Sequence, residues 1–590
     1  MLTPPAAPDA PAGLVPESAP RTRAGRWCAW LAGGFALLMT VMAIVGGVLN
    51  YSAVPYWDMW DGYLGFYLRV LGGDSSAWWS QQSEHRIVLS HGLFWLDLKY
   101  FRGTGLALIW VNYMLCGAAV ILYYRMFKAL TAGHTGTATT TLWFLLAGWL
   151  VQWMQQENLT WAFQSQFLLA QLLPLCGLYC LHRAGGRQGG AGPFALACVC
   201  GVASAGTMAN GILALPIMAL YVIVARQGWR RAAVLAGLAV VTTSLYLHDY
   251  HRPYDTASLG ATFLAHPAGI VRYVLRYFGS PFYFLVGGGR LGQHVALFAG
   301  VMFVIAVTRS AIKTLIGGRA SLALVLLLFL LYLGGSALGT AGGRLFLGDG
   351  QVFASRYTSP ALLAWGALLL LHVQELLPLA ARHSKTAAAI ALLCAGAMFS
   401  AQVTALQRPD QLLFERDVAA LALSLGVHDD ERVVHVYPRV APALAAARAA
   451  YDRKLTVFSH FPLRDAREGL GRSRTVVAPR DCQGAVDQVD AIPGDARYLR
   501  LRGWLFDPGT GTVPAFIWLI NGQQRVVGFA LSGGPRPDVA KLVHRHAARA
   551  GYEGYLLAED VGTDILFQGD ASACQLLMQL PPLPAVAARP

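Results

Sequence analysis

The chain has 590 residues, of which 55% are hydrophobic and only 13% are charged. With a mean hydropathy of +0.45, this composition excludes a single soluble domain and predicts several membrane spans. The formal net charge of +14 could suggest a nucleic-acid ligand, but the cations are spread over short loops and no nucleic-acid-binding motif accompanies them. We therefore expect no nucleic-acid partner and interpret the basic residues as topological signals.

Residues 1–26 are predicted to form a disordered cytoplasmic N-terminus, because the first 20 positions are rich in Pro and Ala. Arg21, Arg23 and Arg26 lead into an apolar stretch at 28–49, which is long enough to cross about 30 Å of hydrocarbon. It has no small-residue cleavage site, so we expect an uncleaved span rather than a signal peptide. The arginines keep the N-terminus inside, so the loop that follows is expected outside.

Apolar segments predict a polytopic α-helical membrane domain over residues 27–405 with about eleven spans and an outer loop at 50–104. The spans are expected at 28–49, 105–124, 140–156, 161–181, 193–209, 211–225, 232–248, 292–308, 321–341, 360–378 and 386–405. Basic residues gather in the loops that this count places inside, and the C-terminus is expected outside. Residues 270–290 fit an interfacial helix, a re-entrant segment or an extra span.

Two carboxylates lie among aromatic residues in the sequence PYWDMWDGY, just after the first span. If this stretch is helical, Asp58 and Asp61 project from one side and raise one another's pKa. Such a carboxylate can accept a proton from a sugar hydroxyl, so both are candidate catalytic residues. The alternative is that one of them only caps an interfacial helix.

Other segments expected on the outer side are unusually polar for a membrane protein and supply candidate substrate-binding residues. These candidates are Glu84, His85, Arg86, Glu157, Asn158, Gln164, Asn210, Arg252, Arg356 and Tyr357. The alternative for SEHR at 83–86 is an ordinary helix start with an acid in its first turn.

Lys and Arg are normally enriched in the cytoplasmic loops of membrane proteins. Arginines expected on the outer side are exceptions to this rule and are therefore candidate phosphate ligands. They are Arg86, Arg252, Arg272, Arg276, Arg344 and Arg356.

The histidines in HDYH at 248–251 have carboxylates nearby in the sequence. A divalent metal ion bound by His248 and His251 is therefore a weak alternative to ordinary interfacial histidines. No HExxH motif or Cys/His frame fixes such a site, so we predict no metal ligands and no definite cofactor.

The last third is polar and predicts an extracytoplasmic part in two pieces. Residues 406–480 are expected to be an α/β connecting region, with helices at 412–426 and 440–453 and strands at 433–438 and 454–461. Residues 481–590 are expected to form a β-sandwich, with a hairpin at Asn521–Gly522. Cys482 and Cys574 flank this unit and are predicted to form a disulfide in an oxidising compartment.

The chain resembles the GT-C superfamily of multi-span glycosyltransferases that use polyprenyl-phosphate-linked sugars. The resemblance covers about residues 25–405 and rests on the long N-terminal span, the outer loop with Asp58 and Asp61, and the segments WDMWD, SEHR, ENLTWAFQSQF and SRYTS, which look like those of an uncharacterised bacterial branch. It implies that an acid of the first outer loop, Asp58 or Asp61, is the general base. It also implies the bacterial inner membrane as location, with a periplasmic C-terminal domain.

The implied partners are membrane lipids, a polyprenyl-phosphate sugar donor and a glycan, lipid or protein acceptor of the cell envelope. No nucleotide-binding GxGxxG or P-loop motif appears, which agrees with a donor that is not a nucleotide sugar. Three alternatives remain open: a lipid-linked-sugar transporter or flippase, a surface-glycan ligase or polymerase, and a non-catalytic assembly protein. A transporter would favour charges at mid-membrane repeated between two halves, and the sequence shows no clear repeat.

Overall fold

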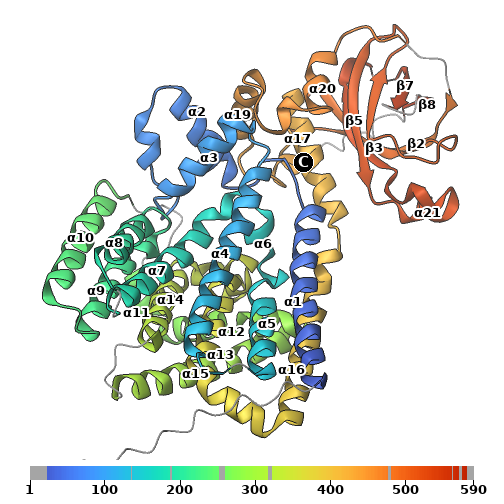
Figure 1. The fold of residues 1–590 in the computed structure, drawn as a ribbon. Coiled ribbons are helices and arrows are strands. Elements are labelled where there is room, and N and C mark those ends of the chain that lie inside the picture. The colour runs from blue at the N-terminus through green and yellow to red at the C-terminus, as the bar shows by residue number, and fades with distance from the viewer. Residues whose placement is uncertain are drawn as a thin grey trace, which may run out of the picture.

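The fold was analysed in a computed structural model that describes residues 23–134, 136–186, 189–251, 259–316, 322–475, 480–560, 562–569 and 574–580. It consists of a large helical body, a smaller group of helices at one end of that body, and a β-rich domain beside this group (Figure 1). The disorder predicted for residues 1–22 and the candidate Arg252 lie outside the described residues. Residues 23–26 already belong to the first helix, so the prediction of disorder was wrong for them.

The helical body contains a helix at each of the eleven segments that the sequence predicts to be apolar spans. These helices are α1 (Arg23–Leu49), α4 (Leu106–Leu130), α5 (Thr137–Leu150), α7 (Ser165–Ala184), α8 (Ala191–Ala205), α9 (Ala214–Val224), α10 (Trp229–Leu247), α13 (Gly289–Ile316), α14 (Leu322–Arg344), α15 (Thr358–Arg382) and α16 (Ser384–Gln402). Within the described ranges, eight helices are long and apolar enough to cross a membrane, whereas α5, α8 and α9 are shorter. A multi-pass membrane protein follows, and the count of eleven spans stays a prediction.

Exposed apolar side chains on the outer helices are typical of surfaces that contact lipid. Trp30 on α1, Phe298 on α13 and Leu392 on α16 are each more than half exposed. By contrast, α14 lies inside the body, where its leucines contact neighbouring helices. The body is therefore arranged around a buried central helix.

Residues 267–285 form one continuous helix, α12 (Pro267–Leu285), which packs along α13. A Cβ atom on Gly279 would lie 1.8 Å from the carbonyl oxygen of Ala296, and one on Gly300 would lie 1.9 Å from that of Leu275. Only glycine permits this close approach of two helix backbones. α12 is not among the eight helices above. A short helix, α11 (Leu259–Ala265), precedes it.

The outer loop at 50–104 packs against helices from the last third of the chain. The loop contains a π-helical turn (Met59–Gly65), α2 (Phe66–Leu71), a 3₁₀ turn (Ser75–Trp79) and α3 (Val88–Tyr100). Its partners are α17 (Asp410–Leu425), α18 (Asp430–Val433), α19 (Val440–Asp452) and α20 (Leu463–Gly469). One hydrophobic core joins them, so the loop and the C-terminal helices lie on the same side of the helical body (Figure 1).

The helices predicted at 412–426 and 440–453 are confirmed by α17 and α19, but the two strands predicted between 406 and 480 are wrong. Val433 ends α18, and Val433, Val436 and Tyr437 are buried while Val434 is exposed. That spacing of three and four residues is helical rather than alternating. Residues 456–459 likewise form a 3₁₀ turn.

The β-rich domain predicted for the C-terminus is confirmed, but its strands belong to one sheet rather than to two packed sheets. The strands are β1 (Arg480–Asp481), β2 (Gln483–Ala491), β3 (Tyr498–Phe506), β4 (Phe516–Ile520), β5 (Val526–Gly534), β6 (Gly551–Leu557), β7 (Asp564–Gly569) and β8 (Cys574–Gln579). Their order is β1-β8-β7-β4-β5-β6-β3-β2, and all neighbours are antiparallel except β1 and β8. The Asn521–Gly522 turn joins β4 to β5 as predicted, and a helix, α21 (Pro537–Leu542), follows β5.

The predicted disulfide between Cys482 and Cys574 is present. Cys482 stands between β1 and β2, and Cys574 begins β8. Since β1 and β2 are at opposite ends of the strand order yet consecutive in the chain, the sheet must curl to bring its two edges together.

Candidate functional site

Polar segments from distant parts of the sequence meet at the end of the helical body that carries the outer loop. Arg344 at the end of α14 pairs with Glu84, with 3.0 Å between Nη2 and Oε2. Arg356, in a 3₁₀ turn before α15 (Ser355–Tyr357), pairs with Glu157 on α6 (Gln156–Thr160), with 2.8 Å between Nη1 and Oε2. These ion pairs link positions that are 260 and 199 residues apart. The structure therefore brings together the outer segments that the sequence predicts to be on one side.

Asp58 immediately precedes the π-helical turn, and its side chain is exposed. None of the described residues forms a hydrogen bond or ion pair with its carboxylate. Although the residue reaches solvent, enough protein surrounds the carboxyl to raise the pKa of Asp58. The positive charges of Arg356 and Arg344 oppose this rise, and the negative charges of Asp61 and Glu84 add to it. Asp58 is thus an uncommitted carboxylate in the electrostatic field of two arginines.

Asp61, one turn later, has a different environment. Tyr437 donates a hydrogen bond to its Oδ2 at 2.5 Å, and Nη2 of Arg439 lies 3.2 Å from the same oxygen. Burial, together with the Asp61 carboxylate, raises the pKa of Tyr437 to about 12, so the phenol remains a neutral donor. Asp61 therefore connects the outer loop to the C-terminal helices.

Trp57, which directly precedes Asp58, has a strained backbone. Its φ is +48°, a region that large side chains rarely adopt, and its N–H donates to the carbonyl of Val436 at 2.8 Å. The indole is 45% exposed. The C-terminal helices thus help to fix the backbone beside Asp58.

Glu84 and His85 are held at the same end of the body by contacts to three other segments. Nδ1 of His85 lies 3.2 Å from the backbone nitrogen of Ala209, and Nε2 of His85 faces Glu84 at 4.0 Å. Burial opposes ionisation of Glu84, but His85 and Arg344 outweigh it and lower the pKa of that carboxyl. Glu84 therefore holds Arg344 in place as an ionised partner.

Arg356 is positioned through both its side chain and its backbone. Asn158 donates from Nδ2 to the Arg356 carbonyl at 2.9 Å and to the Ser359 hydroxyl at 2.7 Å. The guanidinium carbon lies 5.1 Å from the ring centroid of Tyr357, which is buried. Glu157, Asn158 and Tyr357 thus support Arg356.

Arg86 has a different role from the one that the sequence suggests. It is 4% exposed, and its guanidinium donates to the carbonyls of Trp79, Tyr246 and His248 at 2.6–2.8 Å. These bonds join the outer loop to the end of α10. Arg86 thus ties two backbone segments together, with all three of its guanidinium nitrogens bonded to carbonyl oxygens.

Arg272 and Arg276 on α12 share one carboxylate. Both lie within 3.2 Å of Oδ2 of Asp349. Of the five candidate arginines that the structure describes, Arg344 and Arg356 are the two whose charges lower the pKa of Asp58.

Among the described residues, which end at His251 and resume at 259, His248 and His251 contact other groups than a shared metal site. Nδ1 of the exposed His248 lies 3.1 Å from Asp249, and the backbone N–H of His251 donates to Gln81. Within the described ranges, no three His, Cys, Asp or Glu residues gather in a way that could hold a metal ion. The groups around Asp58 include two arginines, which do not ligate cations, so no step is derived through a metal.

Gln164 and Asn210 differ in burial, since Asn210 is only half-buried. Gln164 is fully buried, and neither its amide oxygen nor its nitrogen has a partner among the described residues. Asn210 donates to the Ser336 hydroxyl at 2.8 Å.

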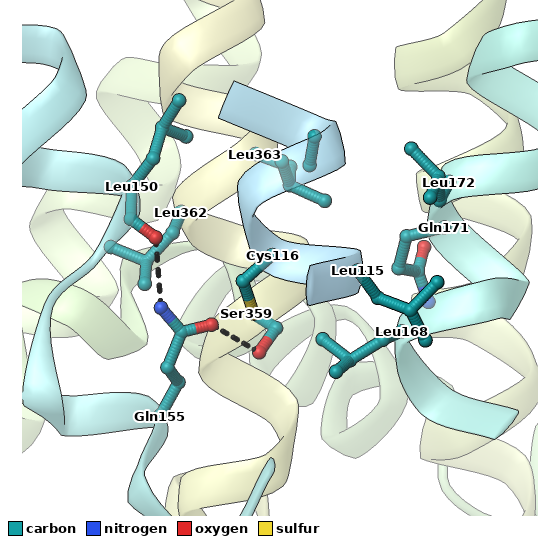
Figure 2. A pocket seen from close by; sticks show the side chains of 11 residues that line it. Leu115, Cys116, Leu150, Gln155, Leu168, Gln171, Leu172, Ser359, Leu362 and Leu363 are labelled. Carbon is teal, nitrogen blue, oxygen red and sulfur yellow. Dashed lines mark hydrogen bonds between the residues drawn. The ribbon is translucent and has the colours of Figure 1, made fainter. Parts of the chain in front are cut away.

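A small cavity inside the helical body is also lined by amides (Figure 2). Gln155 donates to the Leu150 carbonyl at 2.9 Å and accepts from the Ser359 hydroxyl at 2.6 Å. The cavity volume is about 20 Å³, which is room for about one water molecule and far too little for a sugar. These amides serve helix packing rather than substrate binding.

Tyr273 on α12 is a residue that the sequence does not single out. Its hydroxyl is buried without a partner among the described residues, and it lies within electrostatic reach of Arg356 and Arg344. The only signal in the sequence is the helical spacing of Tyr273 and Tyr277 in RYVLRYF, which predicts that both lie on one face.

Comparisons with known proteins give distant structural likenesses. No protein-family description and no curated protein matches the chain. The chain is similar to the oligosaccharyltransferase of Archaeoglobus fulgidus in a complex with zinc and sulfate, at 12% identity and a TM-score of 0.38, over 69% of this chain and 57% of that one. It is also similar to the oligosaccharyltransferase AglB of the same archaeon in complex with an inhibitory peptide and a dolichol-phosphate, at 12% identity and a TM-score of 0.40, over 69% and 59%. The chain thus spans less than two thirds of either structure, and its function has to be argued from its own residues.

Proposed function

We propose that this protein transfers a sugar from a polyprenyl-phosphate-linked donor to a hydroxyl of a cell-envelope acceptor, with Asp58 as the general base. The observation that carries the proposal is the arrangement around Asp58. This carboxylate is exposed and unpaired among the described residues, while Arg344 and Arg356 act on it from two distant segments. A structural acid would be expected to have a partner, as Asp61 does.

The first part of the reaction is proton abstraction. A general base must be free to accept a hydrogen bond from the attacking hydroxyl, and it works best when its pKa approaches the ambient pH. The raised pKa of Asp58 favours this role. The acceptor proton passes to Asp58 as the acceptor oxygen forms its bond to the anomeric carbon.

The second part is departure of the lipid phosphate. The bond between the anomeric carbon and the phosphate oxygen breaks, and its electron pair leaves with the polyprenyl phosphate. Negative charge grows on that phosphate, and preorganised guanidinium groups stabilise developing charge of this kind. Arg344 and Arg356 are held for this task by Glu84 and Glu157, and Tyr273 offers an uncommitted hydroxyl near both.

The domain organisation and location follow from the same proposal. The membrane domain over 27–405 would hold the lipid donor, and residues 406–590 would lie outside with the loop at 50–104. A bacterial inner membrane with a cytoplasmic N-terminus and a periplasmic C-terminal part is the setting that we propose. The shared core of the loop and the C-terminal helices supports placing both on one side.

The test of the function is the glycan composition of the envelope. Cells that lack the protein are complemented with wild type, with Asp58→Asn, or with Asp74→Asn, a half-buried acid of the same loop. We expect one sugar component to disappear without the protein and with Asp58→Asn, and to return with Asp74→Asn. If Asp58→Asn restores it at normal protein levels, Asp58 is not the base.

The side of the membrane is tested by labelling single cysteines with an impermeant maleimide. Asp74→Cys should react from outside, and Lys128→Cys, which follows the second predicted span, should not. The reverse pattern would contradict an extracytoplasmic site.

A further inference from the structure

A second polar site lies in the C-terminal domain, in a groove between α17 and four neighbouring strands of the sheet. The groove has a volume of about 290 Å³, close to the lower end of the range for ligand pockets. Gln411 and Phe414 of α17 form one side, and residues of β2, β3, β5 and β6 form the rest. Nothing in the reaction around Asp58 uses these residues.

The floor of the groove is a row of polar residues across three strands. Gln488 on β2 lies opposite Arg502 on β3, and Arg502 lies opposite Glu553 on β6. Residues in such register project from the same face of a sheet. One amide, one guanidinium and one carboxylate therefore lie side by side.

Each member of this row retains hydrogen-bonding capacity. Arg502 donates from Nη2 to Asp490 at 2.9 Å, and its other nitrogens have no acceptor among the described residues. Glu553 accepts from Arg432 with Oε1, and Gln488 donates from Nε2 to Asp490 at 2.7 Å. Oε2 of Glu553 and Oε1 of Gln488 accept no hydrogen bond within the described ranges. The floor thus offers free donors and free acceptors together.

Charge within the groove is balanced. Arg502 and Arg536 are offset by Asp487 and Glu553, and Nη1 of Arg536 lies 2.6 Å from Oδ2 of Asp487. An anionic ligand would meet two carboxylates, and a cationic ligand would meet two arginines. A hydroxyl group both donates and accepts, so it can pair with all of these side chains. The half-buried ring of Phe414 adds an apolar surface for the C–H faces of a sugar.

We propose that this groove binds a neutral oligosaccharide. The position of the groove fits such a ligand, because α17 begins at Asp410, shortly after the last apolar helix, α16, and its 3₁₀ extension to Leu406. A sugar chain bound there would lie close to the membrane exit. That this chain is the acceptor or the growing product rests on the function proposed above.

The experiment measures binding of the full-length protein in lipid nanodiscs to an array of neutral and acidic oligosaccharides, followed by titration calorimetry with the best neutral binder. Arg502→Met and Gln488→Ala remove groups of the floor. Arg525→Met and Gln523→Ala are matched controls, because both side chains are exposed on the loop between β4 and β5. We expect the floor variants to weaken binding at least about ten-fold, as loss of a charged or shared hydrogen bond does, and the controls to change it less than about two-fold.

Three results would overturn the proposal: no neutral binder on the array, a preference for acidic glycans, or floor variants that bind as tightly as the wild type. Asp58→Asn separates this proposal from the preceding one, since it should bind the oligosaccharide normally. If Asp58→Asn also transferred sugar normally, the catalytic assignment would fail while the groove remained supported.

Discussion

The surroundings of Asp58 and Asp61 differ although the two residues are three positions apart. Asp61 accepts hydrogen bonds from Tyr437 and Arg439 and so fastens the outer loop to the C-terminal helices. Asp58 has no such partner among the described residues and lies in the field of Arg344 and Arg356, each held by its own glutamate. A carboxylate that already accepts hydrogen bonds from protein groups is poorly suited to take a proton. A carboxylate without such partners, and with a raised pKa, is better suited to do so. This difference supports our proposal that Asp58 takes the proton, whereas Asp61 holds two parts of the fold together.

Among the variants of the surrounding residues, the largest effect on transfer is expected when arginines of the two environments are compared. Arg356→Gln should lower the rate of sugar transfer by about 10²–10³-fold, since it removes a charge that stabilises the leaving phosphate. Arg439→Gln should lower it by less than about five-fold, because an exposed ion pair contributes little. The rates are measured in membranes with equal amounts of protein. Equal losses of transfer rate in the two variants would contradict the different roles that we propose for the surroundings of Asp58 and Asp61.

A variant of Arg86 tests whether this residue stabilises the fold rather than taking part in sugar transfer. Arg86→Met leaves the carbonyls of Trp79, Tyr246 and His248 without their donor, which should lower the free energy of unfolding by roughly 3 kcal/mol. The midpoint of thermal unfolding should fall in detergent-purified protein, while the transfer rate per folded molecule stays near that of wild type. A normal midpoint with lost transfer would instead make Arg86 a substrate ligand.

The pH dependence of the transfer rate tests which neighbouring charges shift the pKa of Asp58. The base works when deprotonated, so the rate falls as the pH drops below the pKa of Asp58. Arg344 lowers that pKa and Glu84 raises it. Arg344→Gln should therefore move the acid limb of the pH–rate profile to higher pH, and Glu84→Gln should move it to lower pH. A limb that stays in place in both variants would show that it reports another group.

The smallest effect is expected at the Asp61 contact. Tyr437→Phe removes one hydrogen bond and should cost about 1 kcal/mol of local stability. Hydrogen exchange should rise in residues 56–65 and 433–440, and transfer should change little. If transfer fell as strongly as with Arg356→Gln, the Asp61 environment would belong to the chemistry.

Much of the architecture could be predicted from the sequence, because it depends on local signals. The lengths of the apolar stretches predicted the eleven helical segments, and the Asn521–Gly522 pair predicted a hairpin that is present. The strands predicted at 433–438 and 454–461 failed because short apolar runs are ambiguous, and burial of Val433, Val436 and Tyr437 depends on helices far away in the sequence.

The site could be predicted only in part, because the role of each charged residue depends on its hydrogen-bond and ion-pair partners in the fold. The outer-side arginines look equivalent in the sequence, yet Arg86 bonds to three carbonyls, Arg272 and Arg276 share Asp349, and Arg344 pairs with a glutamate 260 residues away. The choice between Asp58 and Asp61 likewise depends on Tyr437, which is 376 residues from Asp61. Such distant contacts leave no local trace in one sequence.

The most direct test of the account is the initial rate of sugar transfer in membranes that contain equal amounts of Asp58→Asn or Asp61→Asn. Asparagine keeps the shape of each side chain and removes its capacity to take a proton. Loss of a general base costs about 10²–10⁴-fold, so Asp58→Asn should be slower than wild type by that factor while Asp61→Asn retains most of the rate. A rate that survives in Asp58→Asn, or that collapses only in Asp61→Asn, would contradict the assignment.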